Sequence, residues 1–271
     1  MTEKPVAYEY KGKTVSGTTY RIQLVRPPAA KVTLITHTYN SNSTLYLLTR
    51  AFKGFYTDFV TLEEIEEYPT EQAFNDIRNT KLTNPLEFIH MTWLFQDVTR
   101  AFTHQLVRYR VGTAFVQESM RFFGMKGIFK VLVTHKAGDP ESIGSYAHGA
   151  VNAINDYVAL LDRGVPSEDA RGILPTNILT NIYFDCSLRT LQGIFPQRLC
   201  CQAQQGEWQP ILLDMRRQIK AEMGEEIEKL LRAPYESGQP CGYRASFDRP
   251  CIWTKEGDDG TTGSENTKTG A

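Results

Sequence analysis

Long apolar runs are missing from this sequence, and so is a secretory leader. No stretch approaches the length of a membrane span, and no apolar segment follows the polar residues Met1 to Pro5. Only five cysteines occur among the 271 residues. Their low density and odd number favour a reducing compartment, so we expect a cytoplasmic protein. Cys241 and Cys251 are ten positions apart without the spacing of zinc ligands, and no metal site is expected.

A net charge of either sign is nearly absent. The 30 basic and 31 acidic residues give a formal charge of −1, whereas a protein that binds duplex DNA usually has a basic excess. We therefore expect no nucleic-acid partner, although a local basic pocket for a small anion stays open. The composition, 41% hydrophobic and 23% charged, is that of an ordinary soluble globular protein.

Two common catalytic patterns are also missing. Ser119 has no Gly-x-Ser-x-Gly context, and no cysteine has a recognisable reactive setting. No glycine-rich loop of the kind that cradles phosphates is present. The sequence therefore gives no sign of a nucleophilic triad.

The first part of the chain alternates between strand and helix patterns. Residues 6–26 predict a β-hairpin around a Ser-Gly turn, and residues 31–37 predict another strand. Asparagine and serine residues of the N-cap type precede a short helix at 45–52. A charged helix is expected to begin near Thr61, where a capping-box pattern occurs.

The middle of the chain is more apolar. Residues 86–95 fit either a strand or a buried turn. Asp97 is expected to cap a helix whose apolar face ends at Leu106. Residues 129–133 predict a short strand.

Helical patterns dominate the last part of the chain. We expect helices at 147–161, at 178–195 and at 208–232, the second kinked or ended by Pro196. From residue 255 onward the chain is polar and should be disordered. Together the patterns predict an α+β fold.

Three arginines stand out between His104 and Phe123. Arg108 and Arg110 flank one tyrosine, and Arg121 follows a short polar run. An arginine near a helix end can simply complement the helix dipole. Planar guanidinium groups also suit phosphates and the polar edge of an aromatic ring system, so an anion site is the alternative.

A second set of arginines comprises Arg171, Arg189 and Arg198. Arg189 and Arg198 are nine residues apart, so a straight helix would place them on different faces. A kink at Pro196 could bring both to one cavity. Solvated surface arginines are the other interpretation.

These residues resemble the motifs of the flavin-dependent thymidylate synthases. That family carries Arg-His-Arg, seven or eight residues, then Ser followed closely by Arg and an aromatic residue. The sequence matches with Arg108-Tyr109-Arg110, eight intervening residues, and Ser119-Met120-Arg121-Phe122. The segment Thr99 to Val107 matches the preceding Ser-Arg-Ala-x-x-His-Gln-Leu-Val, and Leu86-Glu87-Phe88 matches Leu-Glu-His.

The second half resembles the same family. Leu160 to Asn177, with Arg171, is similar to the segment that leads into the family's catalytic helix. Around Arg189 and Arg198 the sequence follows Asn-x-Arg-Ser-Leu and Leu-Arg, and Ala203-Gln204 follows Ala-Gln. The resemblance covers roughly residues 31–230, and the ordered set of segments is more specific than any single motif.

The resemblance implies a single catalytic domain over residues 1–254, with a disordered tail at 255–271. The implied fold is a mixed sheet packed with long helices, assembled as a homotetramer with active sites at subunit interfaces. The implied cofactors are FAD, NADPH and methylenetetrahydrofolate. The implied reaction converts dUMP to dTMP: the folate supplies a methylene group, and the reduced flavin supplies hydride. No enzyme nucleophile is required, because the cofactors carry the chemistry.

The resemblance also assigns site residues. Arg198 is the expected catalytic residue, which would face the pyrimidine and favour ionisation of its ring N–H. The other nucleotide-binding positions are Gln105, Arg108, Glu118, Ser119, Met120, Arg121 and Arg171. Of these, Gln105 and Arg108 would come from a neighbouring subunit. The flavin-contacting positions are His90, Arg108, Tyr109, Arg110, Ser187, Arg189 and Gly193.

Several positions depart from the family pattern. Tyr109 and Phe88 replace histidines, although His90 would share a strand face with Phe88. Ser187 and Gly193 stand where the family has asparagine. These changes leave two alternatives to dUMP methylation. One is a C5 methylase or hydroxymethylase acting on UMP or dCMP, and the other is a non-catalytic nucleotide-binding homologue. Retention of six matched arginines argues against the second.

Overall fold

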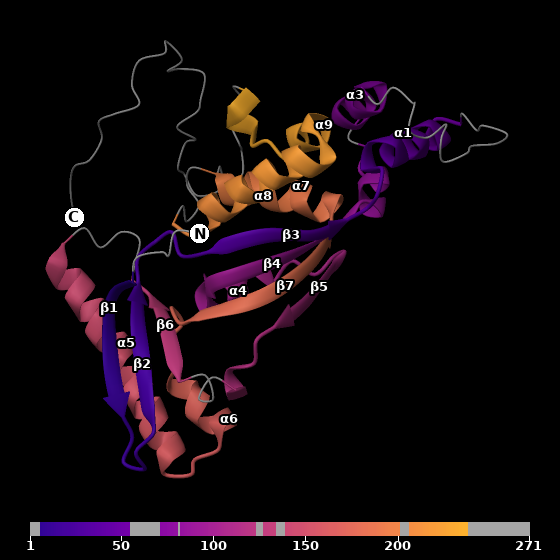
Figure 1. Ribbon diagram of the computed structural model, residues 1–271. Coiled ribbons are helices and arrows are strands. Elements are labelled where there is room, and N and C mark those ends of the chain that lie inside the picture. Colours follow the sequence, from indigo (N-terminus) through magenta and orange to yellow (C-terminus); the bar gives the residue numbers. More distant parts are fainter. Residues whose placement is uncertain are drawn as a thin grey trace.

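The computed structural model describes residues 6–54, 71–80, 82–122, 127–133, 139–200 and 206–237. These residues form two β-sheets flanked by helices, so the predicted α+β class is confirmed (Figure 1). The predicted helix near Thr61 and the predicted disordered tail lie outside the described residues, as do Cys241 and Cys251. Within the described ranges, every helix is too short or too polar to span a bilayer.

The smaller sheet confirms the predicted hairpin. Strands β1 (Val6–Lys13) and β2 (Thr19–Val25) pair antiparallel across a turn in which Gly17 has φ 95°. Strand β6 (Ile128–Leu132) adds to β2 in parallel, which makes the sheet mixed. Helix α5 (Pro140–Asp162) covers one face, and the apolar side chains between the helix and the sheet form one hydrophobic cluster.

The larger sheet has four antiparallel strands. In spatial order they are β3 (Lys31–His37), β4 (His90–Thr99), β7 (Leu179–Ser187) and β5 (Thr113–Gln117). Helices α7 (Leu188–Leu199) and α8 (Trp208–Met223) lie over one face of this sheet (Figure 1). Strand β3 has the predicted bounds. Residues 86–95 contain both expected structures, because Leu86 to Phe88 belong to the 3-10 turn η1 (Asn84–Phe88), where Leu86 is buried, and the strand β4 begins at His90. Phe88 and His90 therefore do not share a strand face as expected.

The expected helix at 178–195 was wrong in its first half. Residues 179–187 form the strand β7, which pairs with β4 on one side and β5 on the other. Ile182, Phe184 and Cys186 alternate toward the core, whereas Tyr183 is 46% exposed on the opposite face. A short apolar run does not distinguish a buried strand from a helix, and here the period of two decides.

The start of the next helix also differs from the prediction. Helix α4 spans Arg100–Leu106, and its N-cap is Thr99, whose hydroxyl accepts a hydrogen bond from Phe102 N. Asp97 is not the cap. It has φ 55°, lies at a β-bulge of β4, and its carboxylate pairs with Lys130 at 3.0 Å.

Two further helices differ in length from their predictions. Helix α5 begins earlier than residue 147, because Asp139 caps it and Pro140 occupies its first turn. The expected helix at 208–232 is broken at Gly224, which has φ 97° and separates α8 from α9 (Glu225–Lys229). Glycine at positive φ ends a helix at little steric cost.

Short helices complete the fold. Helix α1 (Ser41–Phe52) begins earlier than the predicted 45–52 segment and ends at the predicted residue. The remaining elements are α3 (Glu71–Thr80), η1 (Asn84–Phe88), α6 (Ser167–Ala170), η3 (Arg171–Ile173) and η4 (Pro234–Ser237).

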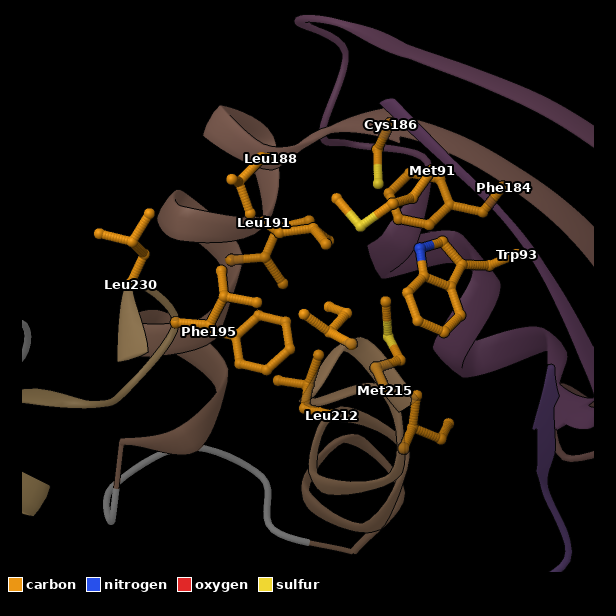
Figure 2. Packing of buried hydrophobic residues seen from close by; sticks show 14 of the residues in the cluster. Met91, Trp93, Phe184, Cys186, Leu188, Leu191, Phe195, Leu212, Met215 and Leu230 are labelled. Carbon is orange, nitrogen blue, oxygen red and sulfur yellow. The ribbon is translucent and has the colours of Figure 1, made fainter. Parts of the chain in front are cut away.

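The main hydrophobic cluster lies between the four-stranded sheet and helices α7 and α8. Figure 2 shows Trp93 and Phe184 from the sheet facing Leu191 and Phe195 from α7, with Met215 of α8 closing the group. Each of these side chains is at most 1% exposed. Burial of this kind contributes about 1.5–3 kcal/mol for each large apolar side chain, so the cluster fixes α7 against the sheet.

At the outer edge of β3, one side chain hydrogen-bonds to two backbone groups. Gln218 of α8 accepts a hydrogen bond from Leu34 N at 2.9 Å and donates one to Val32 O at 3.0 Å. Its amide therefore satisfies the backbone groups that an adjacent strand would otherwise pair with.

Candidate functional site

A cavity of about 530 Å³ opens where η1, the start of β4, the loop after α4 and the start of α7 meet. Its lining residues are Glu87, His90, Arg108, Tyr109, Arg110, Val111, Gly112, Ser187, Arg189, Thr190 and Gly193. All seven positions that the family resemblance assigned to flavin are in this set. The structure thus brings together residues from three separate segments of the chain.

Strand register and a helix cap build the floor of this cavity. His90, the first residue of β4, pairs with Ser187, the last residue of β7. The Ser187 hydroxyl accepts a hydrogen bond from Thr190 N and caps α7. Gly112 passes close to this cap with φ 64°, and a Cβ there would lie 3.1 Å from Ser187 Oγ. A residue without a side chain is therefore needed where the loop crosses the helix start.

Positive charge dominates the cavity wall. Arg108 and Arg110 are exposed, and Arg189 pairs through Nη1 with the carboxylate of Glu87. The lining contains three guanidinium groups and one carboxylate, so the wall suits an anionic ligand. His90 lies beside Asp185 of β7, and its Nδ1 is 3.4 Å from Asp185 Oδ1.

Arg198, near the end of α7, is held by amide and aromatic side chains. Its Nε donates to the Tyr109 hydroxyl at 2.9 Å, and its Nη1 donates to Gln105 Oε1 at 2.8 Å. Its guanidinium carbon lies 4.5 Å from the centre of the Trp208 ring and 5.6 Å from that of Tyr109. The Tyr109 hydroxyl in turn donates to Gln197 Oε1 at 3.0 Å. The side chain is half-buried, and these contacts fix its orientation.

Arg189 and Arg198 do not share the cavity. Helix α7 continues through Pro196 to Leu199, and Arg198 is not among the residues that line the cavity of Arg189. Tyr109 lies between the two, because its ring borders the cavity and its hydroxyl contacts Arg198. Of the two interpretations that the sequence left open, convergence of both arginines on one cavity is not seen here, because only Arg189 lines this cavity.

The predicted nucleotide loop follows β5. It comprises Glu118, Ser119, Met120 and Arg121. The Glu118 carboxylate accepts hydrogen bonds from the backbone and side-chain nitrogens of Asn181, each at 3.0 Å. The Ser119 hydroxyl is 3.3 Å from Arg121 N, and Met120 packs against the α5 cluster. The loop is thus anchored to β7, with Ser119 and Arg121 exposed.

Arginines gather around this loop. Arg121 Nη2 lies 3.1 Å from Glu168 Oε2, and Arg171 Nε donates to the backbone oxygen of Glu168 at 3.1 Å. Arg100 Nη2 donates to Glu118 O at 2.7 Å. Burial lowers the pKa of Arg100, and the charge of Arg171 lowers it further against the opposing effect of Glu118. Arg100, Arg121 and Arg171 form a second basic group, which suits a small anion such as a phosphate.

Helix α4 connects the nucleotide loop with the surroundings of Arg198. Its first residue, Arg100, contacts Glu118, whereas Gln105 near its end contacts Arg198. A seven-residue helix is about 10 Å long, so the loop and Arg198 are separated by roughly that distance along α4. The helix therefore links the loop to Arg198 through side chains near its two ends.

The described residues contain no group of three His, Cys, Asp or Glu side chains that could hold a metal ion. Cys186 is buried and beside Asp185, and burial raises the pKa of its thiol well above the ordinary value.

Comparison with known proteins identifies this arrangement. The family model described as "Thymidylate synthase complementing protein" matches residues 33–224. The chain belongs to this family. The match includes all of the predicted site residues and both basic groups.

Curated members of the thymidylate synthase complementing protein family align over most of the chain. The flavin-dependent thymidylate synthase of Geobacter sulfurreducens is 31% identical over 196 residues, covering 70% of this chain and 82% of that protein. The protein of the same name from Saccharolobus solfataricus is 28% identical over 224 residues, covering 80% of each chain.

A solved structure has a similar fold. It is that of the UMP/dUMP methylase PolB from Streptomyces cacaoi bound with 5-Br dUMP, with a TM-score of 0.56 and 18% sequence identity. The likeness covers 76% of this chain and 95% of that one. At this identity it concerns the fold alone.

Several residues at or near the site were not assigned from the sequence, among them Val111, Gly112 and Thr190 of the cavity lining. Glu87 was quoted only as part of a motif, and Trp208, Gln197 and Glu207 were not singled out. Glu207 is 9% exposed, and its carboxylate accepts two hydrogen bonds from Thr99. Burial raises the pKa of Glu207. A carboxylate directly before the apolar face of a long helix was a signal that could have been noted.

Proposed function

We propose that this protein is a flavin-dependent thymidylate synthase. It transfers a one-carbon unit from methylenetetrahydrofolate to C5 of dUMP, with hydride from reduced FAD and NADPH as the source of electrons. The observation that carries the proposal is that all seven expected flavin positions line one cavity. The names of the curated relatives support the same activity.

The cavity residues fit a flavin. Arg108, Arg110 and Arg189 offer planar donors for its phosphates and for the polar edge of its ring system. Tyr109 and Val111 supply less polar surface for the ring itself. When bound, the flavin supplies the hydride that completes the methyl group. The chain's own residues bind and orient it.

Arg198 is the proposed catalytic residue. Its Nε and Nη1 donate to protein groups, and the hydrogen bonds of Arg198 to described residues do not use Nη2. We assign Nη2 to the pyrimidine. A fixed cation beside the ring N–H favours the deprotonated form and so raises electron density at C5.

The second basic group is proposed to hold the nucleotide phosphate. Arg121 and Arg171 supply the charge, while Glu118, Ser119 and Met120 shape the loop. Gln105 and Arg108 are proposed to reach the nucleotide held by the loop of a neighbouring copy in a homotetramer, and Arg198, which is hydrogen-bonded to Gln105, would face the pyrimidine of that same nucleotide. Support for these assignments comes from the family motifs and from the clustering of the two arginines around Glu168.

A second candidate is methylation or hydroxymethylation of UMP or dCMP. The observation that favours it is Tyr109, which replaces the family histidine and hydrogen-bonds to Arg198 instead of only bordering the flavin cavity. The methylase with the similar fold is named for both UMP and dUMP. A non-catalytic nucleotide-binding protein is the third candidate.

Product analysis separates these candidates. The protein is incubated with FAD, NADPH, methylenetetrahydrofolate and an equal mixture of dUMP, UMP and dCMP, and the nucleotides are examined by mass spectrometry. A methyl group on dUMP supports thymidylate synthesis, and a modified UMP or dCMP, or a hydroxymethyl product, supports the second candidate. No product, together with no uptake of FAD, supports the non-catalytic homologue.

Variants test the role of Arg198. Arg198→Ala should lower kcat at least about 100-fold, because removing a preorganised donor to a developing charge costs on that order. Arg163→Ala, at the exposed end of α5, is the matched control and should keep full activity. Circular dichroism should report the same fold for both. Activity of Arg198→Ala close to that of wild type would refute the assignment.

A further inference from the structure

Trp208 is the first residue of α8 and contacts the Arg198 region in two ways. Its ring lies 4.5 Å beneath the Arg198 guanidinium carbon, and its Nε1 donates to Gln105 Oε1 at 2.9 Å. Gln105 Oε1 is also the acceptor for Arg198 Nη1. One aromatic side chain therefore supports the arginine from below and orients the amide that binds it.

Trp208 is itself rigid. It is 2% exposed, and its ring centre lies 4.3 Å from that of Phe102 in α4. The preceding residue, Glu207, holds the start of α4 through Thr99 with two hydrogen bonds of 2.7 Å. The dipeptide at the start of α8 thus fixes both ends of α4 relative to Arg198.

Tyr109 holds the same arginine from another side. Its hydroxyl accepts from Arg198 Nε and donates to Gln197, so both of its hydrogen-bonding functions are used within this group. The histidine of the family pattern has no hydroxyl. The tyrosine therefore gives Arg198 an anchor that a histidine at this position would not supply through a hydroxyl.

We propose that Trp208 and the Tyr109 hydroxyl are positioning groups for Arg198, which together hold its guanidinium so that Nη2 alone faces the ligand. This inference rests on the proposed role of Arg198 in pyrimidine binding. A free arginine side chain loses rotamer entropy when it is fixed, and an arginine that is already held avoids this loss when substrate binds. The ring of Trp208 also excludes water from one face of the guanidinium and stabilises its charge.

Two conservative variants separate the two anchors. Tyr109→Phe removes only the hydroxyl, and Trp208→Phe keeps an aromatic ring but removes the donor to Gln105. The matched control is Phe184→Leu, a substitution in the main core that does not touch Arg198. Thermal melts of all three identify any variant that fails to fold. If Trp208→Phe does not fold, the test uses Tyr109→Phe alone.

The first measurement does not require activity. Phenylglyoxal modifies accessible arginines, and peptide mass spectrometry gives the rate at each site. The rate at Arg198 should rise about fivefold in Tyr109→Phe and Trp208→Phe, the factor that loss of one net hydrogen bond of about 1 kcal/mol implies. It should not rise in Phe184→Leu. The rate at exposed Arg163 is the internal reference.

The second measurement is steady-state kinetics with dUMP at saturating FAD. Tyr109→Phe should lower kcat about 10- to 100-fold, the range expected for losing one hydrogen bond to a charged group. Trp208→Phe should lower kcat about fivefold, the factor for losing one neutral hydrogen bond, and KM should change less than about threefold in both variants. Phe184→Leu should leave kcat unchanged at a temperature where it is folded. A merely structural role predicts losses that follow thermal stability instead.

The outcomes are distinguishable from failure of the proposed function. If the wild-type protein forms no product, the proposed function fails, and the labelling rates still decide whether Arg198 is held by these groups. If product forms but neither the labelling rate nor kcat changes in the two variants, the positioning role is overturned. If both change in the variants and not in the control, the role is supported.

Discussion

Replacing Thr99 with alanine removes two interactions at the start of α4. The Thr99 hydroxyl accepts from Phe102 N at 3.0 Å as the N-cap, and it donates to Glu207 Oε2 at 2.7 Å. Thr99 is 4% exposed and Glu207 is 9% exposed, so water cannot readily replace either contact. The backbone N–H of Thr99 would still donate to Glu207 Oε1.

The expected cost follows from these contacts. Loss of the cap should cost about 1 kcal/mol. Leaving one oxygen of a buried carboxylate without its partner should cost about 1–3 kcal/mol more. The sum, about 2–4 kcal/mol, corresponds to a fall in Tm of about 4–16 °C for a domain of this size. Because α4 carries Gln105, binding of ligands near Arg198 should weaken as well.

Thermal melts at one protein concentration provide the assay. Thr99→Ser is the matched control, because it keeps the hydroxyl and loses only a methyl group, at a cost of about 1 kcal/mol. Thr99→Ala should therefore melt well below Thr99→Ser. Equal melting temperatures for the two variants would mean that the hydroxyl contacts do not stabilise the fold, and the reasoning would be refuted.

Two further predictions concern Glu207 and the cavity. Burial raises the pKa of Glu207 above its ordinary 4.5, so its contribution to stability is present below pH 4.5 and lost as pH rises through the folded pKa. Glu207→Gln should therefore gain stability relative to wild type between pH 4.5 and neutrality in urea titrations, and a constant difference would contradict this. Gly112→Ala should cost about 1–2 kcal/mol and weaken FAD uptake in fluorescence titrations, because φ is 64° and two hydroxyl oxygens crowd the position. Gly164→Ala, at φ 82° with open space around it, should show the stability cost without the loss of FAD affinity. Equal FAD affinity in the two variants would contradict flavin binding in the cavity beside Gly112.

The local parts of this fold could be predicted from the sequence. The hairpin, β3 and β6 follow from alternation and turn residues, which depend on near neighbours in the chain. The strand β7 could not, because its apolar run satisfied a helical pattern as well as a strand pattern. Its pairing with β4 and β5 decides the matter, and such pairing is not visible in one sequence.

The candidate site was also predictable only where its residues are close together in the sequence. Arg108, Tyr109 and Arg110 are contiguous, so their motif placed them in one cavity before the fold was known. The contact of Arg189 with Glu87 spans 102 positions, and that of Trp208 with Gln105 spans 103. Contacts over such distances depend on the whole fold, and the Tyr109 hydroxyl could not be assigned to Arg198 from spacing.

The side-chain amide of Gln218 has a consequence for how molecules of this protein meet. Exposed sheet edges invite strands from other molecules, and uncontrolled pairing of this kind leads to aggregates. At Val32 and Leu34 the donor and acceptor that a foreign strand would need are already used by Gln218. Copies of the chain therefore cannot join through continuous strand pairing along this part of β3. Association of copies at this part of β3 would use side-chain surfaces instead, and these can specify one partner and one orientation.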